Sequence, residues 1–169
     1  MDKPTWDTED IRVTDEGEDA LTTLDTTIFF EDVETTTEEA EDIGLELHAE
    51  GTYRLVFTDP TDTLVEGDVV IKIRKNMSGV QMNQTEYYGR ENAPDWLRPH
   101  LTPVFGSTKY VVMPRCETEV PKEAFDELWD YVERRDDDIA LSNEFHPQNI
   151  GLYDGVPVVF DFAVDFKLF

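Results

Sequence analysis

The most informative stretch of the sequence is residues 145–163, which read FHPQNIGLYDGVPVVFDFA. The dipeptide Asp154-Gly155 separates two short β-prone runs, and this is a strong short-range signal for a tight hairpin. Asn149 precedes the first run, and Asp161 follows the second run twelve residues later. We therefore expect a two-stranded hairpin between Asn149 and Asp161.

Two charged residues upstream belong to the same pattern. A β-rich run, residues 69–71, is followed directly by Lys72. A lysine at the end of a hydrophobic strand is typical of a phosphate-binding site. Glu86 follows on a segment, residues 80–92, that we expect to be helical, and a glutamate there can hold the lysine in place. We expect Lys72 and Glu86 to face Asp161 across a cleft between a sheet and the terminal hairpin.

These pieces, taken in this order, resemble the protein-kinase-like superfamily, and its aminoglycoside phosphotransferase and Rio-type branches more than typical eukaryotic kinases. Residues 145–150 are similar to the LHPGNI catalytic loop of those small-molecule kinases, and Asp161-Phe162-Ala163 is similar to the DFG tripeptide. Residues 49–56 lie where the glycine-rich loop over ATP should be. The resemblance extends over residues 44–165.

The resemblance implies that the protein binds ATP and Mg²⁺. Lys72 would bind the phosphates and Glu86 would orient the lysine. Asn149 and Asp161 would hold the metal, because Mg²⁺ prefers a few hard oxygen ligands together with phosphate oxygens.

Three further roles are implied by the same resemblance. Gly51 would belong to the loop over the nucleotide, and Met113 would be part of the hinge against adenine, with Pro114 and Arg115. Glu144 stands five residues before Asn149, where the family has its catalytic aspartate.

The sequence also departs from the family pattern. A glutamate at position 144 reaches one methylene further than aspartate, and a misplacement of ~1 Å can cost on the order of 10²-fold in rate. Ala49 and Arg54 replace the glycines that flank Gly51, and the DFG glycine is Ala163. The chain has eight residues after Asp161, so we expect a much reduced C-terminal lobe. These departures favour nucleotide binding over turnover.

Each of these residues also has an ordinary structural interpretation. Lys72 is explained as an edge-strand lysine that extends to water, and Glu86 as an exposed residue that pairs with Arg90 four positions later. Asn149 suits a turn, and Asp161 suits a cap. The joint order and the interval from Asn149 to Asp161 favour the kinase-like interpretation.

The pattern of elements predicts an α+β fold with the kinase-like arrangement of an antiparallel N-lobe sheet and one helix, followed by a C-lobe of one helix and a hairpin. Strands are expected at residues 52–57, 68–74, 101–105 and 109–113. The clearest amphipathic helix begins at Pro121, since apolar residues recur there with helical spacing at Phe125, Leu128, Trp129 and Val132.

The N-terminal region has a different character. Residues 1–33 are acidic and lack clear periodicity, so we expect a loosely ordered extension. A short helix is expected at residues 36–41, and residues 34–169 would form a single kinase-like domain.

Composition limits the classes of partner. The 169 residues carry 39 acidic and 14 basic side chains, for a net charge of −25. Such a surface repels nucleic acid and anionic membranes. The absence of a long apolar run, the polar start of the chain and the single Cys116 favour a cytoplasmic protein. The acid excess resembles that of proteins from extreme halophiles.

Three functions remain open from the sequence. The first is an ATP–Mg²⁺-binding kinase-like protein that transfers phosphate to a protein or to a small-molecule hydroxyl. The second is a catalytically inactive pseudokinase that serves as a binding or regulatory module in a halophilic archaeon or its virus. The third is an acidic interaction protein whose fold merely resembles a kinase N-lobe.

The charge leads to a first prediction. Because molar salt shortens the Debye length to about 3 Å, the repulsion within a chain of charge −25 should be screened, and the folded state should gain stability. The thermal midpoint, followed by circular dichroism, should rise as KCl increases from millimolar to molar concentration. A midpoint that stays flat or falls would contradict the halophilic interpretation.

Overall fold

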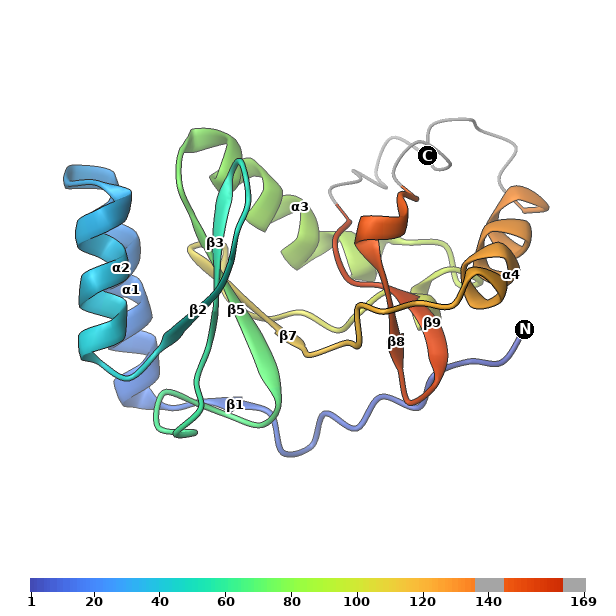
Figure 1. Ribbon diagram of the computed structural model, residues 1–169, viewed down its shortest axis with the longest axis horizontal. Helices are drawn as coiled ribbons and strands as arrows, with labels where there is room; N and C mark the ends of the chain where they lie inside the picture. The colour runs from blue at the N-terminus through green and yellow to red at the C-terminus, as the bar shows by residue number, and fades with distance from the viewer. Residues whose placement is uncertain (136–144, 163–169) are drawn as a thin grey trace.

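The computed structural model describes residues 1–135 and 145–162. Its centre is an antiparallel five-stranded sheet in the order β2-β3-β5-β7-β6 (Figure 1). The strands are β2 (Glu46–Glu50), β3 (Arg54–Thr58), β5 (Val69–Arg74), β7 (Tyr110–Pro114) and β6 (Phe105–Gly106). The central position of β5, between β3 and β7, places Lys72 in the interior of the sheet and not at an edge.

Two helices, α1 (Asp15–Phe30) and α2 (Val33–Asp42), pack against one face of this sheet. Leu21, Leu24 and Ile28 on α1 are buried in one core with the sheet residues Leu55 and Ile71. Part of the other face of the sheet is covered by α3 (Met77–Asn92), which begins at the N-cap Asn76 and contacts β5 and β7.

The expectation of a loosely ordered extension at residues 1–33 is wrong for α1. Thr14 caps the helix by accepting a hydrogen bond from the amide of Gly17. Leu21, Leu24 and Ile28 recur with helical spacing, so they form an apolar stripe that the many acidic residues around it concealed in the sequence.

The segment before α1 connects the two ends of the molecule. The short strand β1 (Arg12–Val13) pairs with β4 (Val65–Glu66) beside the sheet. Further towards the N-terminus, Trp6 donates a hydrogen bond to the carbonyl of Pro99 and packs on the ring of Tyr153, 4.4 Å between centroids. In Figure 1 this segment runs below the sheet to the C-terminal hairpin.

The C-terminal part has a core of its own. It contains α4 (Lys122–Glu133) and the hairpin of β8 (Ile150–Tyr153) and β9 (Val156–Val159). Two single-turn 3₁₀ helices, η1 (Arg98–His100) and η2 (Pro147–Asn149), complete it. Asp154 and Gly155 adopt φ values of 51° and 76°, which is the turn that the sequence predicts.

The α+β class is confirmed, with helices α2, α3 and α4 and the hairpin near their expected positions. Several strand assignments differ. Residues 12–13, 46–50 and 65–66 form strands that the sequence analysis did not expect. Of residues 101–105, only Phe105 belongs to a strand of the sheet, whereas Leu101 forms an isolated bridge with Val159. No helix in the described part of the chain is long and apolar enough to cross a membrane.

The packing of α1 leads to a second prediction. A Cβ atom at Gly17 would lie 2.0 Å from the carbonyl oxygen of Leu64, which is backbone and cannot easily move. Gly17→Ala should therefore lower the free energy of unfolding by about 1–3 kcal/mol, although alanine in a free helix is more favourable than glycine by ~1 kcal/mol. Urea denaturation in molar KCl measures the change.

The control is Thr26→Ala, at an exposed position of the same helix. It should leave stability nearly unchanged. If Gly17→Ala were neutral or stabilising, α1 would not be docked against the Leu64 backbone in solution.

Candidate functional site

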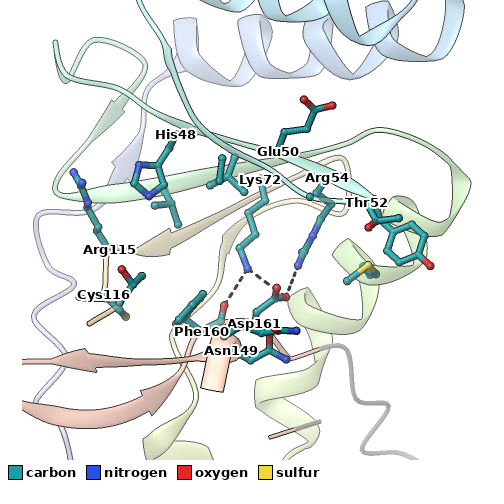
Figure 2. A pocket seen from close by; sticks show the side chains of 18 of the residues that line it. His48, Glu50, Thr52, Arg54, Lys72, Arg115, Cys116, Asn149, Phe160 and Asp161 are labelled. Carbon is teal, nitrogen blue, oxygen red and sulfur yellow. Dashed lines mark hydrogen bonds and ion pairs between the residues drawn. The ribbon is translucent and has the colours of Figure 1, made fainter. Parts of the chain in front are cut away.

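A cavity of about 580 Å³ lies between the sheet and the C-terminal hairpin. Figure 2 shows side chains from β3 and β5 entering it from one side and those of Asn149, Phe160 and Asp161 from the other. Its walls include the β2–β3 loop, the sheet residues Val56 and Val70, and residues 114–116 at the end of β7. The cavity therefore joins segments that are far apart in the sequence.

Lys72 lies at the inner end of this cavity. It is 4% exposed, so its ammonium group requires partners within the protein. Its Nζ donates to Glu86 Oε1 at 3.3 Å and to the carbonyl oxygen of Phe160 at 2.9 Å, and it lies 3.7 Å from Asp161 Oδ1. The expected geometry of Lys72, Glu86 and Asp161 is present.

Glu86 is fully buried on α3 and is the centre of the polar network. Burial raises the pKa of its carboxyl, while the positive charges of Lys72 and Arg54 oppose that rise. Its Oε1 also accepts a hydrogen bond from the backbone amide of Phe162 at 3.3 Å. Glu86 thus connects the sheet, the helix and the chain after β9 through one carboxylate.

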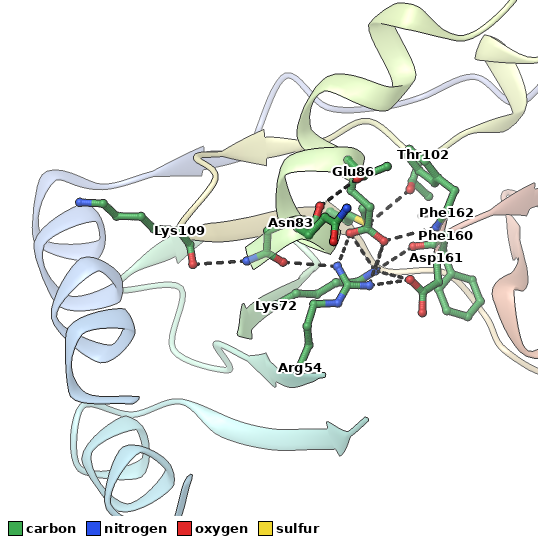
Figure 3. A network of polar contacts seen from close by, with 12 residues as sticks. Arg54, Lys72, Asn83, Glu86, Thr102, Lys109, Phe160, Asp161 and Phe162 are labelled. Carbon is green, nitrogen blue, oxygen red and sulfur yellow. Dashed lines mark hydrogen bonds and ion pairs between the residues drawn. The ribbon is translucent and has the colours of Figure 1, made fainter. Parts of the chain in front are cut away.

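Arg54 is the main residue of this site that the sequence analysis missed. The sequence pattern indicates only that it replaces a glycine, yet its side chain is 5% exposed and points into the network (Figure 3). Nη1 and Nη2 donate to the two oxygens of Glu86, at 2.5 and 2.9 Å, and Nη2 also donates to Asp161 Oδ1 at 2.5 Å. Burial acts to lower the pKa of Arg54, but these carboxylates outweigh it and raise the pKa.

The alternation of β3 is the signal that could have revealed Arg54. Val56 pairs with Lys72 across the two strands, so both side chains lie on one face of the sheet. Arg54 is two residues from Val56 and therefore belongs to the same face. A long cationic side chain at position 54, two residues before the cavity-lining Val56, is therefore expected to extend into the same cavity as Lys72.

Asp161 follows β9 and completes the network. Its side chain is 35% exposed. Burial acts to raise the pKa of its carboxyl, but the nearby charges of Lys72 and Arg54 outweigh this effect and lower the pKa to about 2. Asp161 is therefore an anion at neutral pH. Figure 2 shows Asn149 next to it, and the backbone amide of Phe160 donates to the carbonyl of Asn149 at 3.0 Å. The hairpin brings the two residues into one cavity.

The ordinary structural interpretations of Lys72 and Glu86 do not hold. Lys72 lies on an inner strand, not on an edge. Arg90 donates to the carbonyl of Leu101 and does not pair with Glu86.

Two of the other predicted site residues lie in the described structure. Gly51 lines the cavity, and its amide donates to the carbonyl of Arg54 at 2.9 Å. Met113 does not line the cavity, contrary to expectation, because its side chain is buried in the C-terminal core, where its sulfur accepts a hydrogen bond from the Thr102 hydroxyl. The adjoining Pro114 and Arg115 line the cavity instead.

Two predicted features lie outside the described residues. They are Glu144, the expected base, and Ala163, the third residue of the DFG-like tripeptide. The site as described thus contains the residues expected to bind phosphate and metal, and not the residue expected to act on an acceptor.

The residues of the cavity do not fit Mg²⁺ in their present arrangement. Asp161, the charged ligand expected for the metal, already accepts a short hydrogen bond from Arg54 through Oδ1. A guanidinium beside this oxygen both occupies a coordination direction and repels a second cation. No group of three or more His, Cys, Asp or Glu side chains suited to a metal occurs among residues 1–135 and 145–162.

The remainder of the cavity has apolar surface on both sides. Val56 and Val70 on the sheet side and Phe160 on the hairpin side offer apolar surface. Cys116 also lines the cavity, but burial raises the pKa of its thiol to about 12, so it is protonated at neutral pH and a poor nucleophile.

Comparison with known proteins adds no assignment. Neither the models of known protein families nor the sequences of curated proteins match this chain.

Proposed function

We propose that the cavity binds ATP or a closely related nucleotide, in a domain of the protein-kinase-like type. The observation that carries this proposal is the buried Lys72–Glu86 pair, with Asp161 beside it, at the inner end of a 580 Å³ cavity. A lysine held by a helix glutamate next to an aspartate is the arrangement that positions nucleotide phosphates in kinases.

The dimensions and lining of the cavity support this choice. Its volume is within the range of about 300–1,000 Å³ that is usual for small-molecule sites. The apolar surface of Val56, Val70 and Phe160 suits a purine ring, and the charged end suits its phosphates. The chain has only 14 basic residues and a net charge of −25, yet Arg54, Lys72 and Arg115 all line this one cavity. The carboxylates of Glu50 and Asp161 line it too, so an anionic ligand is favoured where it can replace a carboxylate on one of these cations.

Transfer of phosphate to a protein or small-molecule hydroxyl is the catalytic form of this proposal, with Glu144 as the base. The alternative is a pseudokinase that binds nucleotide without turnover. A specific observation favours the alternative: Arg54 holds the carboxylate of Asp161, which a kinase uses for its metal.

Nucleotide binding is the third prediction. Isothermal titration calorimetry in molar KCl should detect ATP binding to the wild-type protein. Lys72→Met should lower the affinity by about 10- to 100-fold, because a charged hydrogen bond contributes about 1.5–3 kcal/mol. The control is Lys122→Met, the same substitution at an exposed residue of α4.

Circular dichroism should show that both variants are folded. The proposal is contradicted if wild-type protein does not bind ATP, or if Lys72→Met binds it as well as Lys122→Met does.

Turnover is the fourth prediction, and it separates the two forms of the proposal. In an active enzyme, Glu144→Ala should leave ATP binding nearly intact and lower phosphoryl transfer by about 10²-fold or more, since a base acts on the acceptor hydroxyl and not on the nucleotide. Release of ADP in molar KCl is the measurement.

Glu144→Asp is the sharper variant, because it restores the residue of the family. Impaired transfer indicates an enzyme adapted to glutamate, and improved transfer indicates a degenerate site. If neither the wild-type protein nor Glu144→Asp consumes ATP although both bind it, the pseudokinase form is supported.

A further inference from the structure

We propose that Arg54 takes the place of a metal ion, so that the cavity binds the phosphates of its ligand without a divalent cation. This inference rests on the proposed nucleotide site and concerns how that site neutralises phosphate charge. In the proposed complex, the guanidinium of Arg54 exchanges its bond to Asp161 for a bond to a phosphate oxygen, while its bonds to Glu86 remain.

The charges in the network act against a divalent cation at Asp161. Arg54 and Lys72 contribute two positive charges, and Glu86 and Asp161 contribute two negative charges. The four groups are therefore balanced among themselves. A divalent cation at Asp161 would add two positive charges beside a guanidinium and an ammonium group, and the buried position makes their repulsion stronger than in water.

The hydrogen bonds show which partner of Arg54 can be exchanged. A guanidinium has five N–H donors in a fixed planar fork. Glu86 accepts from both Nη atoms, is fully buried and lies within α3, so it fixes the orientation of the group. Asp161 accepts from Nη2 only, and its side chain is 35% exposed and faces the cavity. Asp161 is therefore the partner that a phosphate can displace.

Arginine is well suited to this exchange. Its fork matches the geometry of phosphate and carboxylate equally, so one can replace the other on the same nitrogen atoms. Lys72 donates to Glu86 and to the carbonyl of Phe160, and its Nζ lies 3.7 Å from Asp161 Oδ1, farther than the 2.5 Å contact of Arg54 Nη2 with the same oxygen. Arg54 is thus the cation in direct hydrogen-bond contact with the carboxylate that a phosphate would replace.

The fifth prediction tests the wild-type protein first. ATP binding is measured by calorimetry in molar KCl, once with EDTA and once with MgCl₂. We expect the two dissociation constants to agree within about threefold. A tenfold or greater requirement for Mg²⁺ would overturn this inference and leave the proposed nucleotide site intact, whereas no binding in either buffer would refute both.

Asp161→Asn is the decisive variant, since it preserves shape and removes the charge. If Arg54 binds the phosphate, the variant should bind ATP in EDTA at least as tightly as the wild type, because the competing carboxylate is gone. If Asp161 carries a metal, the variant should instead lose affinity by tenfold or more in MgCl₂. The control is Asp154→Asn, the same change in the exposed turn of the same hairpin.

Arg54→Gln completes the test. It should lower ATP affinity in EDTA by tenfold or more and make the remaining binding depend on Mg²⁺. If this variant does not fold, because Glu86 has lost a buried partner, Asp161→Asn still decides the question. Unchanged ATP affinity of folded Arg54→Gln in EDTA would show that the arginine has only a structural role.

Discussion

The arrangement of the molecule depends on the hydrogen bonds and ion pairs that the buried carboxylate of Glu86 makes. This carboxylate accepts hydrogen bonds from Arg54 on β3, from Lys72 on β5 and from the backbone of Phe162 after β9. The helix that carries it, α3, is thereby joined to two strands of the sheet and to the end of the hairpin. Removal of this one group would leave two cations buried without full compensation, and such a change is strongly destabilising.

A buried network of charged groups is not an efficient way to stabilise a fold. The desolvation of buried ions offsets much of their attraction, and apolar residues of the same volume often hold a core equally well or better. The cores on either side of the network are in fact apolar, with Leu55 and Ile71 on one side and Leu97 and Leu128 on the other. Titratable groups clustered beside a cavity in this way are found more often at functional sites than elsewhere in a fold.

The sequence predicted those parts of the structure that depend on local patterns. The turn at Asp154-Gly155, the periodicity of α4 and the order of Lys72, Glu86 and Asp161 were all visible without coordinates. Residues whose role depends on tertiary contacts were not visible. In the sequence, Arg54 is recognisable only as a residue that replaces a glycine. The register of β3 and β5 then shows that it lies on the same face of the sheet as Lys72. Helix α1 was concealed because its apolar stripe is narrow among acidic residues, and the burial of Met113 depends on the packing of the second core.

Salt screens the exposed acidic side chains strongly and the buried charges of the site much less. At molar salt the Debye length of about 3 Å screens charges that are exposed on the surface, so a net charge of −25 need not repel an anionic ligand at a distance. The contacts of Arg54 and Lys72 with their carboxylates are 2.5–3.7 Å long, and both cations are nearly excluded from solvent. Salt ions cannot enter between such groups, so these contacts keep their strength where surface attraction is lost. A site that binds an anion inside this chain must therefore depend on short, buried contacts, and Arg54 and Lys72 provide them.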